Sequence, residues 1–120
     1  MYPNQKMSKA LEVMRSHDEH MPAQRLVTFL FVAQRGKATR EDVMEATGMG
    51  LASAYRNLMI LSSEPYFDND KKKHQGLGLL KASWDDNKTR HMGPRRRRVW
   101  EVTAKGLRVL SQIEDIMRDD

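Results

Sequence analysis

Residues 39–61, TREDVMEATGMGLASAYRNLMIL, decide the fold of this chain, because they predict two short helices joined by a tight turn. Thr39 is a good N-cap for the first helix, and Asp42 completes a short-armed capping box three residues later. Gly48 supplies a left-handed residue, which ends a helix without a clash at Cβ. A helix, a glycine-containing turn and a second helix form the arrangement known as a helix-turn-helix.

The second predicted helix begins after Gly50 and has two different faces. Ala54, Leu58 and Leu61 recur at spacings of four and three residues, which predicts an apolar face packed on the core. We expect Met49 to fill the gap between the two helices. In a helix-turn-helix that binds DNA, the second helix lies in the major groove. The face available for this comprises Leu51, Ala52, Ser53, Tyr55, Arg56 and Met59.

Two further helices are predicted on the N-terminal side of this pair. Ser8 is a candidate cap for the first, which ends near His17. Pro22 suits the first turn of the other. From Pro22 to Arg35 the sequence is apolar on almost every side, as expected for the central helix of the core.

A β-hairpin is predicted after the helix pair, with strands at 78–84 and 96–102. Alternation along the second strand predicts that Trp100 and Val102 face the core. We expect Arg98 to brace the hairpin through an ion pair with Asp85 or Asp86.

The segment 66–78, which precedes the hairpin, contains the polar run DNDKKKH and predicts a mobile loop. Tyr66 and Phe67 are expected to tuck beneath this loop. Its three consecutive lysines, residues 71–73, are expected to be solvated, with a secondary phosphate contact as the alternative.

Positive charge is concentrated in one part of the chain. The formal net charge is +5, and residues 88–98 contain six cations and no acid, which leaves −1 (+5 minus +6) on the rest. Such concentration favours a local contact with a polyanion over a general role in solubility. The six cations are Lys88, Arg90, Arg95, Arg96, Arg97 and Arg98.

Two parts of the sequence resemble the MarR-type winged helix-turn-helix regulators. TGMGLASAYRNLMIL at 47–61 has that family's turn glycine, small helical residue and leucine pair. GLGLLKASWDDNKTRHMGPRRRRVWEVTAKGLRVL at 76–110 has the order of its wing and final helix: apolar strand, aspartates, arginine cluster, apolar strand and T-x-K-G. The resemblance spans residues 22–117. It extends especially to small MarR-like proteins of bacteriophages, in which MPxQ opens a helix and GLGL opens the wing.

This resemblance implies an α+β, mostly α fold: a winged helix-turn-helix with a small antiparallel β-hairpin wing and terminal dimerisation helices. Residues 1–120 would form a single such domain. Its expected parts are an N-terminal helix (1–20), the core helix and helix-turn-helix (22–62), the wing (77–103) and a C-terminal helix (104–118).

DNA contacts are expected from three places in such a fold. Ser53 and Arg56 reach base edges, and Arg matches guanine O6 and N7. Thr39 and Arg40 meet a phosphate through backbone N–H groups and charge. The arginine cluster follows the phosphate backbone; the alternatives are a solvated charged hairpin or a site of interface salt bridges. The expected DNA-binding residues are Thr39, Arg40, Leu51, Ala52, Ser53, Tyr55, Arg56, Lys88, Arg90, Arg95, Arg96 and Arg97.

The C-terminal helix, capped by Thr103, carries an apolar stripe that is long for packing within so small a domain. We expect this stripe and the N-terminal helix to form a homodimer interface, with packing inside one chain as the alternative. A dimer would place two recognition helices about 34 Å apart along DNA and predicts a near-palindromic site. The expected dimerisation residues are Leu11, Met14, Leu107, Leu110, Ile113, Ile116 and Met117.

Other classes of protein find little support in the sequence. Cysteine is absent, which excludes disulfides and thiolate metal sites. No histidine pair, phosphate-binding loop or nucleophile motif is evident, so we expect no metal, no cofactor and no enzyme. Neither a signal peptide nor an apolar run of about 20 residues is present. We therefore expect a cytoplasmic protein, in a bacterial or phage-infected cell, that makes no membrane contact.

Taken together, these features predict a homodimer that binds double-stranded DNA at a specific sequence and regulates transcription. Two alternatives stay open: a winged helix that docks on a host protein of the transcription or replication machinery, or an accessory DNA-binding protein in packaging or replication. The apolar residues Leu51, Ala52 and Met59 favour the docking alternative.

Overall fold

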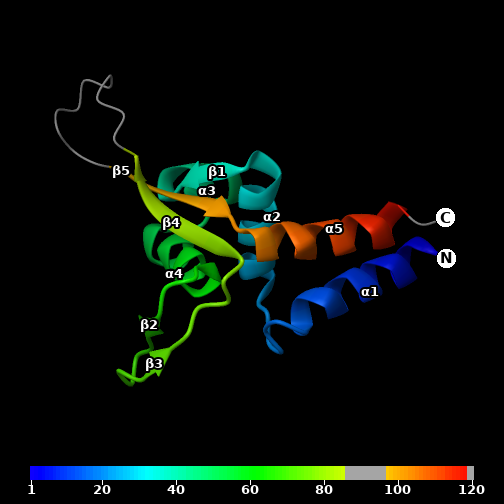
Figure 1. Ribbon diagram of the computed structural model, residues 1–120, viewed down its shortest axis with the longest axis horizontal. Helices are drawn as coiled ribbons and strands as arrows, with labels where there is room; N and C mark the ends of the chain where they lie inside the picture. The colour runs from blue at the N-terminus through cyan, green and yellow to red at the C-terminus, as the bar shows by residue number, and fades with distance from the viewer. Residues whose placement is uncertain (86–96, 119–120) are drawn as a thin grey trace.

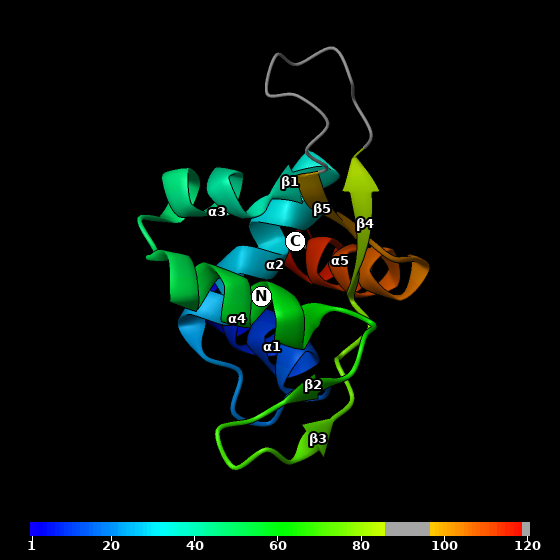
Figure 2. The same cartoon turned by 90° about the vertical axis from the view of Figure 1, so that its left-hand side faces the viewer.

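Helices make up most of the computed structural model, which describes residues 1–85 and 97–118. These ranges contain five helices and two small antiparallel sheets, which confirms the prediction of a mostly helical α+β fold (Figures 1 and 2). The elements are α1 (Pro3–Arg15), α2 (Ala23–Arg35), β1 (Lys37–Thr39), α3 (Arg40–Thr47), α4 (Leu51–Leu61), β2 (Tyr66–Phe67), β3 (Lys73–His74), β4 (Leu80–Asp85), β5 (Arg97–Val102) and α5 (Ala104–Arg118).

Helix α2 is the centre of the core, as its apolar sequence predicts. It packs against α3, α4 and α5 and against strands β1 and β5. Phe29 and Val32 on this helix are completely buried. Because α2 contacts elements on several sides, its apolar residues are not confined to a single stripe along the helix.

Strand β5 is the middle strand of the larger sheet, whose order is β1–β5–β4. Strands β4 and β5 form the predicted hairpin pair, whereas β1 was not predicted from the sequence. Trp100 is buried as expected, but Val102 is only half-buried and Val99 is buried as well. Val99 pairs with Thr39 of β1 on one side and with Ser83 of β4 on the other, so it lies in the middle of the sheet.

Helices α1 and α5 lie side by side and extend away from the sheet, with both termini at their far end (Figure 1). We call this pair the α1–α5 limb. The prediction that the first helix is capped by Ser8 is wrong, since α1 begins at Pro3. Pro3 occupies the first helical position, where its missing N–H costs nothing, and the backbone N–H of Tyr2 donates to the Gln5 side chain at 3.1 Å.

The segment that was predicted as a loop forms a small hairpin, β2–β3. Tyr66 pairs with His74 and Phe67 with Lys73. Tyr66 is half-buried, but Phe67 is 63% exposed, so the expectation that both would be covered is wrong for Phe67. The hairpin exists because the Asp68 carboxylate accepts hydrogen bonds from backbone N–H groups in its turn.

Candidate nucleic-acid interface

The capping box predicted at the start of α3 is present. Thr39 Oγ1 accepts a hydrogen bond from the Asp42 N–H at 3.1 Å, and the Thr39 N–H donates to Asp42 Oδ2 at 2.9 Å. The bond from Thr39 is the main cause that holds the pKa of Asp42 below its usual range. Gly48 ends the helix in the left-handed conformation, at φ 77°, as predicted. These local bonds fix the direction in which the chain enters α4.

Met49 fills the gap between the helices, also as predicted, and it is held there by polar neighbours. Thr28 Oγ1 and Asn57 Nδ2 each lie 3.7 Å from its sulfur atom. Asn57 is buried on α4 and was not predicted to have this role. Its signal in the sequence is its position, because it lies three residues after Ala54 and four before Leu61 on the apolar face.

Helix α4 buries one side and exposes the other. Ala54, Leu58 and Leu61 are completely buried, as their spacing predicts. Figure 2 shows the helix at the front of the molecule, on the end opposite the far tip of the α1–α5 limb. The predicted contact residues divide into exposed Leu51, Ala52, Tyr55 and Arg56 and half-buried Ser53 and Met59.

Two side chains on this exposed face have different surroundings. The Tyr55 ring meets Trp100 edge-on, with 6.3 Å between the ring centroids, which ties the face to the sheet. Arg56 makes no ion pair with any residue in 1–85 or 97–118. Arg56 is therefore free to pair with an anion or a base edge.

The two residues predicted to contact a phosphate at the N-terminus of α3 differ in exposure. Thr39 is 7% exposed, its N–H donates to Asp42 and its hydroxyl oxygen accepts from the Asp42 N–H, so its hydroxyl hydrogen is the group that remains for a ligand. Arg40 is partly exposed and lies 3.2 Å from the Glu41 carboxylate. Its surface ion pair is weak enough to be exchanged for a phosphate.

The first two residues of β5 point to different neighbours. The positive charge of Arg97 is close enough to Asp42 to add to the lowering of its pKa, after the larger effect of the Thr39 N–H. Arg98 pairs with Glu64 at 2.7 Å, a partner that was not predicted from the sequence. Glu64 follows α4, so this ion pair joins the sheet to the end of that helix.

Four of the expected DNA contacts cannot be placed. Lys88, Arg90, Arg95 and Arg96 lie outside the described residues, as does Asp86. The chain enters their segment from Asp85 at the end of β4 and leaves it at Arg97. These two residues are cross-strand partners, and they lie at the end of the sheet nearest α3 (Figure 1).

The expected dimerisation residues separate into two groups. Met14 is 1% exposed, so it packs inside the protomer. Leu110 and Ile113 also pack against the core, and Ile116 is half-buried. The residues that remain exposed are Leu11, Leu107 and Met117, together with Met7, which was not predicted.

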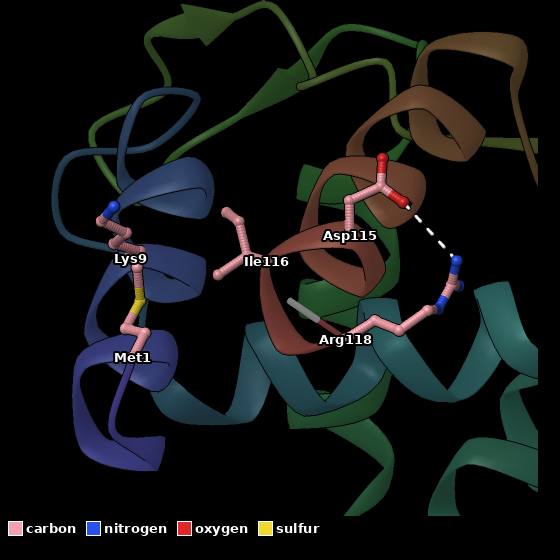
Figure 3. Close-up of a pocket in the computed structure, with 5 residues that line it drawn as sticks. All are labelled: Met1, Lys9, Asp115, Ile116 and Arg118. Carbon is pink, nitrogen blue, oxygen red and sulfur yellow. Dashed lines mark ion pairs between the residues drawn. The ribbon is translucent and has the colours of Figure 1, made fainter. Parts of the chain in front are cut away.

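A shallow pocket lies between α1 and α5 near the termini (Figure 3). Met1 and Lys9 line one side, and Ile116 extends into the space from α5. Asp115 is turned toward Arg118, with 3.8 Å between their charged atoms. The pocket therefore offers apolar contacts, the Lys9 ammonium and the exposed Asp115–Arg118 ion pair.

No group of three or more His, Cys, Asp or Glu side chains in residues 1–85 and 97–118 is arranged to hold a metal ion. None of the helices in these ranges has the length and hydropathy needed to span a bilayer. No protein-family model matches the sequence, and neither a curated protein nor a solved structure is significantly similar to it.

Proposed function

We propose that this protein is a homodimeric winged helix-turn-helix protein that binds double-stranded DNA at a specific sequence and regulates transcription in the manner of the MarR type. The observation that carries the proposal is the exposed face of α4. One side of the helix anchors it to the core through Ala54, Leu58 and Leu61, while the other presents Arg56 without an ion-pair partner among the described residues. A rigidly held helix that presents an arginine on its outer face can enter a major groove and contact a base edge there.

Charge around α4 supports the same proposal. Arg40 and Arg97 lie near the start of α3, and the sequence adds Lys88, Arg90, Arg95 and Arg96 between β4 and β5. In this arrangement the β4–β5 ribbon, formed by strands β4 and β5 and the segment between them, supplies phosphate contacts, which raise affinity for any DNA sequence. Arg56 supplies base contacts, which select among sequences. Occupancy of an operator would then control the adjacent gene.

The α1–α5 limb supports a homodimer. Leu11, Leu107 and Met117 leave apolar surface exposed on both of its helices. A second copy is the occupant we propose, because a two-fold contact lets each limb cover the same residues of the other. The resulting dimer would present two α4 helices about 34 Å apart, which fits two half-sites one helical turn apart.

The test is selection from a pool of random duplexes at two salt concentrations, with wild type, Arg56→Ala and the control Arg108→Ala. Arg108 is exposed on α5, so its substitution removes the same charge from the limb. We expect a near-palindromic site for wild type and control. For Arg56→Ala we expect affinity for that site to fall about 5- to 100-fold, with weaker preference at one base pair of each half-site.

Salt dependence provides the second readout of this experiment. If about six phosphates are neutralised per dimer, the logarithm of the association constant should fall with the logarithm of salt at a slope near −5. A slope near zero would contradict phosphate binding by the ribbon. Binding without sequence preference would instead indicate an accessory role in DNA packaging or replication.

Docking on a protein of the host is the second candidate function, and one observation favours it. Leu51, at the start of α4, is 53% exposed, and Tyr55 is exposed one turn further on. Apolar and aromatic residues at the centre of an exposed face are typical of protein interfaces. Failure of wild type to bind any duplex would leave this candidate in place of DNA binding.

A further inference from the structure

The turn of the β2–β3 hairpin presents Lys71, Lys72 and Lys73 in succession, and all three are exposed. None of their ammonium groups pairs with a carboxylate among residues 1–85 and 97–118. The same segment has two acids, Asp68 and Asp70, so its net charge is modest. What matters is how these opposite charges are arranged.

Asp68 is used inside the turn. Its carboxylate accepts hydrogen bonds from the N–H groups of Asp70 at 2.8 Å and Lys72 at 2.9 Å. The same carboxylate lies 2.7 Å from Nε2 of His74, and this contact is the main cause that lowers its pKa. The Asp68 carboxylate is therefore held inside the turn by these bonds, whereas the lysine side chains extend into solvent.

The two faces of the hairpin also differ. On one face the Tyr66 ring stacks on His74, with 5.3 Å between the ring centroids. On the other face Phe67 and Lys73 are cross-strand partners, and both are exposed. Lys73 thus places a cation beside the Phe67 ring, and both side chains are open to solvent and to a ligand.

The base of the hairpin is fixed to the end of α4. The Gln75 side chain donates to the carbonyl of Ser63 at 2.8 Å, and the N–H of Leu77 donates to the carbonyl of Ile60 at 2.9 Å. Gly76 lies so close to Ser62 that a Cβ would overlap the Ser62 carbonyl oxygen. The hairpin therefore has a defined position relative to α4, unlike a loop attached only at its ends.

Figure 2 shows α4 between two ribbons, with β2–β3 on one side and the open end of β4–β5 on the other. Helix α4 has 11 residues and is thus about 16 Å long, whereas the major groove is about 12 Å wide. A helix that enters the groove by its N-terminal turns leaves its C-terminal end at the rim, where phosphates lie. The lysines of β2–β3 are attached at that end.

We propose that the β2–β3 hairpin is a second phosphate-binding ribbon, which contacts the DNA backbone on the side of α4 opposite β4–β5. This inference rests on the proposed function, because it requires that α4 bind double-stranded DNA. The contribution is electrostatic and independent of sequence, so the hairpin lengthens the bound site without adding base selection.

The experiment compares wild type with a hairpin variant, Lys71→Asn, Lys72→Gln and Lys73→Gln. Asn is used at 71 because that residue has φ 62°, which Asn tolerates. A control variant, Lys6→Gln, Lys9→Gln and Arg108→Gln, removes the same charge from the α1–α5 limb. Binding to the duplex selected by wild type is measured over a range of salt, and ethylation interference maps the contacted phosphates. Circular dichroism and sedimentation check that each variant keeps its fold and mass.

We expect the salt slope of the hairpin variant to be shallower by about 2 per dimer, which corresponds to one phosphate contact for each hairpin, with an unchanged preferred sequence. Phosphates at the outer edges of the site should drop out of the interference pattern of the hairpin variant. The control variant should retain the salt slope and the interference pattern of wild type. If wild type binds duplex and the hairpin variant matches the control in salt slope and interference pattern, the proposal of a second phosphate-binding ribbon is wrong and the proposed function stands. If wild type binds no duplex, both are wrong.

Discussion

At the scale of single residues, hydrogen bonds from short polar side chains determine where the backbone of this protein starts a helix or makes a turn. Thr39 and Asp42 begin α3 by exchanging hydrogen bonds, and Asp68 closes the β2–β3 turn in a similar way. Each bond satisfies an N–H group that the adjacent secondary structure leaves free. The carboxylates involved are bound in their ionised form, so the fold acquires a dependence on pH.

Asp42 allows this pH dependence to be tested. Its pKa is lowered from 3.8 in the folded protein, chiefly by the Thr39 N–H, so folding favours the ionised carboxylate. The stabilisation is fully present above the unfolded value and is lost as pH falls through the folded value. We expect Asp42→Asn to be less stable than wild type near neutral pH, and we expect this difference to shrink as the pH falls below 3.8, as measured by urea unfolding. A constant difference across this range would contradict the assignment.

At the scale of secondary-structure elements, prediction succeeded where the signal is local. The cap at Thr39, the left-handed Gly48 and the spacing on α4 are read within a few residues, and the α3–α4 pair follows from them. Strand β1 could not be predicted, because its three residues are held by pairing with β5, some sixty positions away in the chain. The β2–β3 hairpin was missed for another reason. A turn organised by one carboxylate has the composition of a solvated loop.

Gly76 offers a sharp test of how the hairpin joins α4. A Cβ at this position would overlap the Ser62 carbonyl oxygen, so Gly76→Ala must displace the backbone. We expect a loss of about 1–3 kcal/mol in the free energy of unfolding, together with weaker DNA binding. Gly50→Ala is the control for stability, since a Cβ there meets nothing within 4 Å and its φ is −72°, so it should lose only the preference of an N-cap for glycine over alanine. Equal stability of the two variants would show that the close approach does not constrain the hairpin.

At the scale of the whole molecule, the two ends have different character. The exposed face of α4 and both ribbons lie at one end, and the α1–α5 limb with both termini forms the other (Figure 1). Periodicity predicted the apolar stripe of the limb but could not tell burial inside one chain from burial between two. Met14 illustrates this, because its spacing resembles that of Leu11, yet Met14 is inside the protomer and Leu11 is 42% exposed.

Oligomeric state tests the limb directly. We expect sedimentation equilibrium to give a dimer for wild type and a monomer for the double variant Leu11→Glu and Leu107→Glu. Charges introduced at these exposed positions oppose burial against a second copy but leave the core intact. Val27→Glu, also at an exposed apolar position, is the control and should remain a dimer. A monomeric wild type would contradict the dimer, and the double variant should then bind DNA as wild type does.

The close approach of Gly76 to Ser62 has a consequence for the design of this chain. The backbone leaves the end of α4 and returns to almost the same place, so residues 63–75 form a closed excursion. The two ends of this segment lie next to each other. Its exchange for a segment of another length would therefore leave the path of the chain on either side unchanged. The reach of the protein along a nucleic acid could thus change in length or charge while the core stays as it is.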